Sequence, residues 1–99
     1  MPLSDDGNAL RLKDDDNVAV CLRAITAGST VRFGSLAVRA LADIPAGHKI
    51  ALEAIACGDL VRKYGQPIGK TSAAVAAGEH VHVHNVEGMR GRGDLAETA

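Results

Sequence analysis

Three histidines alternate with valines near the end of the chain, in the segment His80-Val81-His82-Val83-His84. If this segment is a β-strand, successive side chains point to opposite faces, so the three imidazoles share one face. Neighbouring histidines on that face would lie about 6.6–7 Å apart at Cα, near enough for two rings to bind one metal ion. All three rings could reach one metal ion only in strained conformations, because the outer two histidines are twice as far apart. A pair of these histidines plus a ligand from elsewhere is therefore favoured.

Histidine is also the side chain best suited to moving protons near neutral pH. His82 and His84 are therefore candidate acid–base groups, and His80, His82 and His84 together are candidate metal ligands. The alternative is a polar stripe on an edge strand that faces solvent, with Val81 and Val83 packed inward.

Other residues that could carry chemistry lie beside glycines. His48 and Lys49 follow a turn glycine, an arrangement in which a lysine could bind a carboxylate while a histidine moves a proton. Tyr64 and Gln66 lie in a segment rich in glycine and proline, where the Gln66 amide could bind substrate hydroxyls. Asn85 directly follows the histidines. The alternatives are an exposed turn pair at 48–49 and a half-buried core ring at Tyr64.

A seven-residue motif, the repeated phrase, occurs four times in the sequence. Its copies predict the turns and strands that must position these residues. It reads aliphatic, any residue, Ala or Cys, Gly, two residues, aliphatic, and its copies cover 25–31, 44–50, 55–61 and 75–81. Each glycine can take a positive φ at no steric cost, so each copy predicts a tight turn that starts a strand. The spacing indicates an internally duplicated β-unit.

Alternation of apolar and polar residues predicts the strands themselves. They cover 17–25, 30–33, 48–52, 60–64 and 80–86. Segment 36–41 is compatible with a strand or a helical turn, 51–56 with a helical turn, and 65–69 with an irregular loop. The predicted fold class is mainly β, a single domain with one or two short helical turns.

Size and composition limit the class of protein. The 99 residues suffice for one domain, which we expect at 15–86 between a polar, solvated arm (1–14) and a Gly/Arg-rich tail (87–99). A net charge of −1 gives no electrostatic basis for binding nucleic acid or an anionic membrane. No apolar run approaches the roughly 20 residues needed to span a bilayer. Cys21 and Cys57 are expected to be free, buried thiols of a cytoplasmic protein.

Several blocks of the sequence resemble, in order and spacing, the small domain of the altronate/galactarate dehydratase family. The blocks are 44–52, 63–69 and 78–86, with shorter matching stretches at 16–20 and 90–94. The resemblance covers about residues 15–94. It implies an SAF-type domain with a β-clip fold.

The same resemblance implies the activity and the partners. The family removes water or sulfite from a hydroxylated sugar acid or sulfo-acid, usually with a divalent metal such as iron. Some members carry this domain ahead of a large catalytic domain, and others encode it as a free small subunit, which this chain resembles. We therefore expect a separate large subunit that holds most of the metal ligands, and a homo-oligomer is also compatible with the pattern.

On this resemblance His82 and His84 are the expected catalytic residues. The expected substrate-binding residues are His48, Lys49, Tyr64, Gln66 and Asn85. Altronate, galactarate and sulfolactate all stay open as substrates. A non-catalytic module for substrate binding or assembly is the alternative function, and a stand-alone metal-binding protein is a third.

Overall fold

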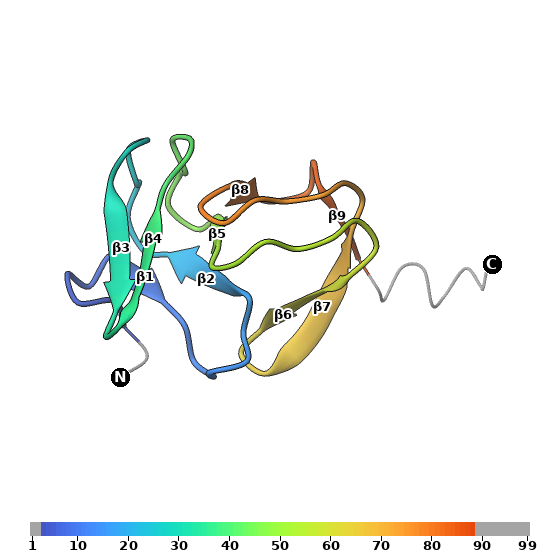
Figure 1. The fold of residues 1–99 in the computed structure, drawn as a ribbon, viewed down its shortest axis with the longest axis horizontal. Helices are drawn as coiled ribbons and strands as arrows, with labels where there is room; N and C mark the ends of the chain where they lie inside the picture. Colours follow the sequence, from blue (N-terminus) through green and yellow to red (C-terminus); the bar gives the residue numbers. More distant parts are fainter. Residues whose placement is uncertain (1–2, 89–99) are drawn as a thin grey trace.

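The computed structural model describes residues 3–88 and contains short strands joined by turns (Figure 1). The strands are β1 (Ala9–Leu10), β2 (Val18–Cys21), β3 (Thr30–Phe33), β4 (Leu36–Arg39), β5 (Lys49–Ala51), β6 (Leu60–Lys63), β7 (Gln66–Thr71), β8 (His80–Val81) and β9 (Val86–Gly88). Residues 3–88 contain no helix. The mainly β fold class is confirmed, whereas the helical turn expected at 51–56 is wrong, because Ala51 ends β5 and Ile55 forms a β-bridge to Val75.

The strands form antiparallel sheets in three groups. One sheet has the order β1-β2-β5-β8, β3 and β4 form a hairpin, and β6-β7-β9 form the third group. Figure 1 shows the β3–β4 hairpin at one end and the β6-β7-β9 group at the other, with β2 and β5 between them. The central strands β2 and β5 therefore have a packing partner on each side.

Two apolar cores lie on opposite faces of this central sheet. Ile50 belongs to the first core, with Val31 and Phe33. Its neighbour Ala51 belongs to the second, with Val61. This division follows from the alternation of side chains along β5. Aliphatic residues supply nearly all of both cores, as the scarcity of aromatic residues requires.

The repeated phrase forms the predicted turn in all four copies. Gly28, Gly47, Gly58 and Gly78 have φ between 86° and 90°, a region that side-chain-bearing residues rarely adopt. In each copy the backbone N–H of the residue after glycine donates to the carbonyl three residues earlier. The copies meet in pairs, through the bridges Ile25↔Ile44 and Ile55↔Val75. The internal duplication expected from the sequence is therefore present in the fold.

Two segments near the β6-β7-β9 group have a secondary structure that differs from the one predicted. The expected loop 65–69 is the beginning of β7, and a register shift opposite Val61 and Arg62 accounts for its irregular sequence. The expected strand 80–86 ends at Val81, and residues 82–85 form a turn before β9.

The described part of the polar arm packs on the domain. The side chain of Ser4 is buried and accepts a hydrogen bond from Ala9 N–H at 3.0 Å, and β1 pairs with β2. Leu12 and the two residues that follow it are exposed. The domain bounds 1–14, 15–86 and 87–99 stay predictions, and most of the predicted tail lies outside the described residues.

Both cysteines are free, as predicted. Cys21 is buried, and desolvation raises the pKa of its thiol to about 11. Cys57 is exposed rather than buried, because it occupies a turn position of the third repeated phrase. None of the described residues forms a helix long and apolar enough to cross a membrane.

Candidate functional site

All four histidines of the chain gather at one edge of the central sheet. His48 immediately precedes β5, His80 lies on β8, and His82 and His84 lie in the turn that follows. The pairing of Ile50 with His80 brings the first histidine beside the other three. Between ring centroids, His48 lies 3.6 Å from His82, and His80 lies 4.9 Å from His84. The sequence predicted the cluster at 80–84 but assigned His48 to a pair with Lys49.

The rings of His48 and His80 meet edge to edge. His48 Nδ1 and His80 Nε2 are 2.8 Å apart, a hydrogen-bond distance, and the ring planes differ by 24°. One nitrogen must carry the proton and the other must accept it. Protonation of both rings on these atoms would remove the acceptor, so this contact requires one of the two nitrogens to stay unprotonated.

His82 stacks on His48 with an interplanar angle of 13°. Its Nδ1 is a buried side-chain nitrogen without a hydrogen-bond partner in the described part of the chain. Native structures rarely leave such an atom unpaired, and exceptions often mark catalytic groups or sites for a missing water or ion. Among the four histidines, His82 is therefore the best candidate for chemistry.

Asn85 builds the turn that carries His82 and His84. Its Oδ1 accepts the N–H of His82 at 3.0 Å, and its Nδ2 donates to the carbonyl of His80 at 2.9 Å. Such side-chain bonds compete with strand pairing, which is why the predicted strand stops at Val81. Val83, expected to pack inward, is 81% exposed. Asn85 is itself buried and positions the histidines from within the turn.

Desolvation and neighbouring charges lower the pKa values of two histidines of the cluster, His80 and His82. The pKa of His82 is lowered from its ordinary value by desolvation, and further by the charges of His48, Lys49 and His84. The pKa of His80 is lowered by desolvation, then by the other three histidines and Lys49. Both imidazoles are therefore free bases at neutral pH, the form in which histidine accepts a proton.

These shifts make the stability of the domain sensitive to acid. Unfolding restores the ordinary pKa of 6.5 to His80 and His82, so below about pH 6.5 the unfolded chain binds more protons than the folded one. We expect the free energy of unfolding to be highest above that pH and to fall as the pH drops towards the lowered folded values. Urea titrations between pH 7.5 and pH 5.5 would measure the slope.

The matched control for this titration is a double variant with glutamine at positions 80 and 82. Glutamine does not titrate, and carboxylates titrate mainly below this range. The slope should therefore flatten in the double variant. An unchanged slope would show that other groups cause the acid sensitivity.

The arrangement of the histidine rings does not favour the predicted metal site, in which His80, His82 and His84 are the ligands. The lone pairs of an imidazole lie in its ring plane, so stacked rings do not direct their nitrogens to one point, and the contact between His48 and His80 occupies one nitrogen of each ring. The described residues contain no group of three or more His, Cys, Asp or Glu side chains that could hold a metal ion. Metal binding by His80, His82 and His84 stays a prediction.

The remaining predicted residues do not all join the histidines. Lys49 pairs with Val20 and Val81 in the sheet register, one position out of phase with His80, so its side chain points to the opposite face. Tyr64 and Gln66 lie at the tip of the β6–β7 hairpin. In the described chain no hydrogen bond or ring contact connects this tip to the histidine cluster.

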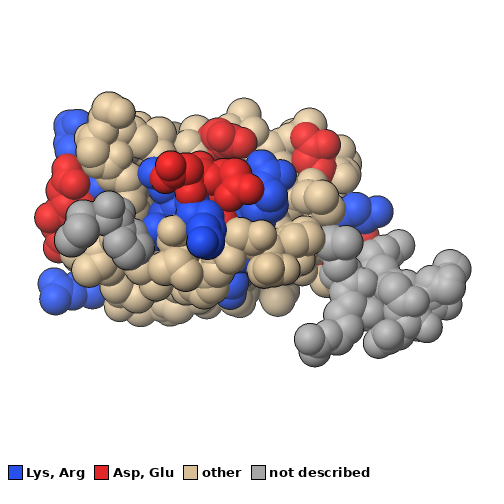
Figure 2. Space-filling model, turned by 90° about the horizontal axis from the view of Figure 1, so that it is seen from below, with Lys and Arg blue, Asp and Glu red and all other residues tan. Residues whose placement is uncertain are grey.

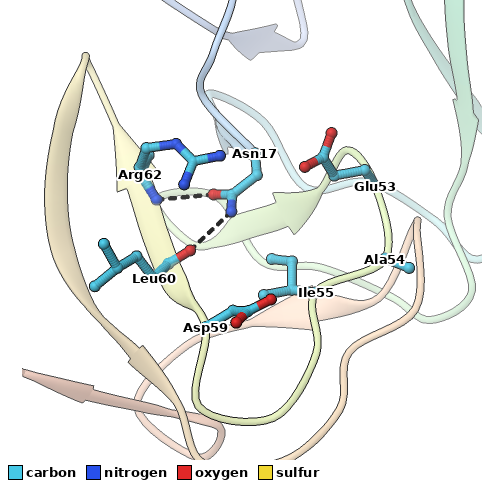
Figure 3. Close-up of a pocket in the computed structure, with 7 residues that line it drawn as sticks. All are labelled: Asn17, Glu53, Ala54, Ile55, Asp59, Leu60 and Arg62. Atoms are coloured by element: carbon cyan, nitrogen blue, oxygen red, sulfur yellow. Dashed lines mark hydrogen bonds between the residues drawn. The ribbon is translucent and has the colours of Figure 1, made fainter.

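Asp16 and Asn17 hold the β6–β7 hairpin, a role that sequence reasoning missed. The Asn17 amide bonds both Leu60 and Arg62 (Figure 3), with its Oδ1 accepting Arg62 N–H at 2.8 Å. The buried Asp16 carboxylate accepts the N–H groups of Tyr64 and Gly65 at the tip. The sequence signal is a polar pair at the boundary of the predicted strand 17–25, with Asp16 directly before it and Asn17 as its first residue.

A surface pocket of about 330 Å³ lies beside this hairpin, away from the histidines. Figure 3 shows Asn17 projecting from the start of β2 towards β6, with Glu53 to its right and Asp59 below it in this view. The pocket therefore mixes one guanidinium, that of Arg62, with two acidic groups. Acidic and basic side chains also lie side by side on the face shown in Figure 2.

Comparison with known proteins gives a consistent set of relatives. The family model for the altronate/galactarate dehydratase SAF domain matches residues 7–89. An altronate dehydratase of Bacillus subtilis (strain 168) is 40% identical over 78 residues, which are 79% of this chain and 16% of the relative. An altronate dehydratase of Escherichia coli (strain K12) is 49% identical over 70 residues, 71% of this chain and 14% of the relative.

A shorter relative matches over most of its own length. The (2R)-sulfolactate sulfo-lyase subunit alpha of Paracoccus pantotrophus is 51% identical over 51 residues, which are 52% of this chain and 76% of that subunit. The chain thus spans about a sixth of the altronate dehydratases but most of a lyase subunit. The same domain occurs as a small part of long enzymes and as most of a separate subunit.

Proposed function

Because the chain belongs to the altronate/galactarate dehydratase SAF domain family, we propose that it is the small subunit of a carbon–oxygen or carbon–sulfur lyase. In this proposal it acts in the cytoplasm with a separate large catalytic subunit on a sugar acid or sulfo-acid such as altronate, galactarate or sulfolactate. The observation that carries the proposal is the cluster of four histidines, with an unpaired buried nitrogen on His82. The match to most of a sulfo-lyase subunit supports the two-chain form.

The proposed reaction is an elimination that this chain assists with protons. A base removes the proton α to the carboxylate, and the electron pair forms a double bond as the β-substituent departs, either as water after protonation or as sulfite. His82 is the proposed base, because its lowered pKa leaves it unprotonated at neutral pH. His84, which is exposed in the same turn, is the proposed acid. The large subunit would hold the divalent metal that stabilises the carboxylate of the carbanion-like intermediate.

Reconstitution tests this proposal. We expect the isolated chain to be inactive, the large subunit alone to have little activity, and their mixture to remove water or sulfite from one of the candidate acids. Ultraviolet absorbance of the product or release of sulfite would follow the reaction. Full turnover by the large subunit without this chain would contradict the proposal.

One observation favours a non-catalytic assembly module as the second candidate. Val83, between His82 and His84, is an apolar side chain that is 81% exposed, and contact with a partner chain would remove it from water. In this alternative the histidines contribute to association, and their removal would weaken assembly while leaving turnover of the assembled enzyme unchanged.

A further inference from the structure

The pocket beside the β6–β7 hairpin shares no lining residue with the histidine cluster. Its volume of about 330 Å³ lies at the lower end of the range of about 300–1,000 Å³ that is typical of small-molecule sites. Three segments form it, namely Asn17 before β2, residues 53–55 and residues 59–62. Asn17 and Ile55 are buried, so part of the lining is fixed in place. The pocket is therefore large enough for a small ligand.

Arg62 brings a guanidinium group whose position in this pocket is fixed. Its Nε donates to the carbonyl of Asp15 at 2.9 Å, and its backbone N–H donates to Asn17 Oδ1 at 2.8 Å. Figure 3 shows the guanidinium beside the Asn17 side chain. The two terminal guanidinium nitrogens form no hydrogen bond or ion pair with a described residue. They can therefore bind a carboxylate through two parallel hydrogen bonds.

Two carboxylates line the same pocket without pairing with this guanidinium. The side chains of Glu53 and Asp59 are exposed, and the one ion pair formed between described residues joins Arg11 to Asp14. Within the described part of the chain, neither carboxylate accepts a hydrogen bond. The pocket therefore holds opposite charges that a ligand carrying both an anionic and a cationic group would complement.

The internal duplication supplies a comparison for this arrangement. Arg32 lies four residues after the glycine of the first repeated phrase, as Arg62 does in the third. Arg32 lines a smaller pocket, of about 180 Å³, with Asp5 and Asp6. The Asp6 carboxylate already accepts hydrogen bonds from its own loop, and no hydrogen bond to a described residue holds the Arg32 side chain. The equivalent position in the duplicated unit therefore does not produce the same set of groups.

We propose that the larger pocket binds a free amino acid with a cationic side chain. The carboxylate of the ligand would pair with the terminal nitrogens of Arg62, and its two ammonium groups would interact with Glu53 and Asp59. Such a ligand carries a single net positive charge at neutral pH, whereas the charged side chains of the pocket carry a single net negative charge. A sugar acid would instead add a negative charge beside two carboxylates. Occupancy of this site does not depend on the proposed reaction.

NMR titration of the ¹⁵N-labelled chain with L-lysine tests the site. At constant pH and ionic strength, we expect saturable shifts of the Arg62 backbone amide and the Asn17 side-chain amide, which bond directly to each other. The comparison probes are cadaverine, which lacks a carboxylate, and gluconate, which lacks an ammonium group. L-lysine should bind more tightly than either by about tenfold or more. Equal or tighter binding of either probe, or no saturable shift with L-lysine, would overturn the proposal.

Variants of the arginine test the carboxylate half of the site. Arg62→Gln should weaken L-lysine binding by about 10–100-fold, because the charge-assisted pair is lost. Arg62→Lys keeps the charge but not the planar fork and should have an intermediate affinity. Arg32→Gln is the matched control and should bind as the unmodified chain does. Unchanged affinity of Arg62→Gln would contradict the assignment.

Variants of the two acids test the ammonium half and do not disturb the hydrogen bonds of Arg62. Glu53→Gln and Asp59→Asn change exposed side chains, so the spectrum of the folded domain should be retained. In the double variant the preference for L-lysine over gluconate should fall by about tenfold or more, since the attraction for ammonium is lost and the repulsion of the anion is removed. An unchanged preference would show that the acids do not contribute to binding, which would overturn the proposal.

Discussion

Replacing His82 by alanine is expected to lower the turnover of the reconstituted enzyme by about 10²–10⁴-fold, the range typical for loss of a general acid or base. The reason is that His82 combines a lowered pKa with a buried nitrogen that has no partner in the described structure. Steady-state rates of the assembled enzyme would measure the loss. Because the proposed base acts in the transition state and not in substrate binding, we expect a large fall in kcat and a smaller change in KM.

His82→Gln separates catalysis from assembly. Glutamine keeps a polar amide of similar size but cannot act as a base, so both variants should lose turnover while binding the large subunit normally. Val83→Ala, at the neighbouring exposed position, should retain turnover. If both His82 variants turn over normally once assembled but associate weakly, the chain is the non-catalytic module instead.

Replacing Asp16 by alanine is expected to destabilise the domain by about 2–4 kcal/mol. The Asp16 side chain is buried and accepts three backbone N–H groups, from Lys13, Tyr64 and Gly65. Removing an acceptor leaves buried donors unsatisfied at about 1–3 kcal/mol each, and water can replace part of the loss at the exposed tip. Urea unfolding followed by Tyr64 fluorescence would measure both the stability and the environment of the tip.

Asp15 provides the matched control. Its side chain is exposed, and only its backbone carbonyl is used, as the acceptor for Arg62 Nε at 2.9 Å. Asp15→Ala should therefore change the free energy of unfolding by no more than about 0.5 kcal/mol. If the two variants are equally stable, the carboxylate of Asp16 does not hold the hairpin.

The features that the sequence predicted well are local ones. Gly47 and the other phrase glycines adopt the expected positive φ, and 30–33 is a strand as predicted. Each of these depends on the conformational preferences of a few adjacent residues. The strand prediction at 80–86 failed because the alternation of His and Val carries no information about Asn85, whose side chain bonds the backbone of the turn.

The sequence by itself determined the turns, most strands, the aliphatic character of the core and the family. Only the tertiary structure decided which candidates meet: antiparallel pairing of β5 with β8 brings His48 to His80 across 32 positions and turns Lys49 away from them. It also showed that Asp16 holds Tyr64, 48 positions away. Local patterns determine the conformation of a segment, whereas the register between distant strands depends on the packing of the whole chain, because shifting it by one residue would exchange the two faces.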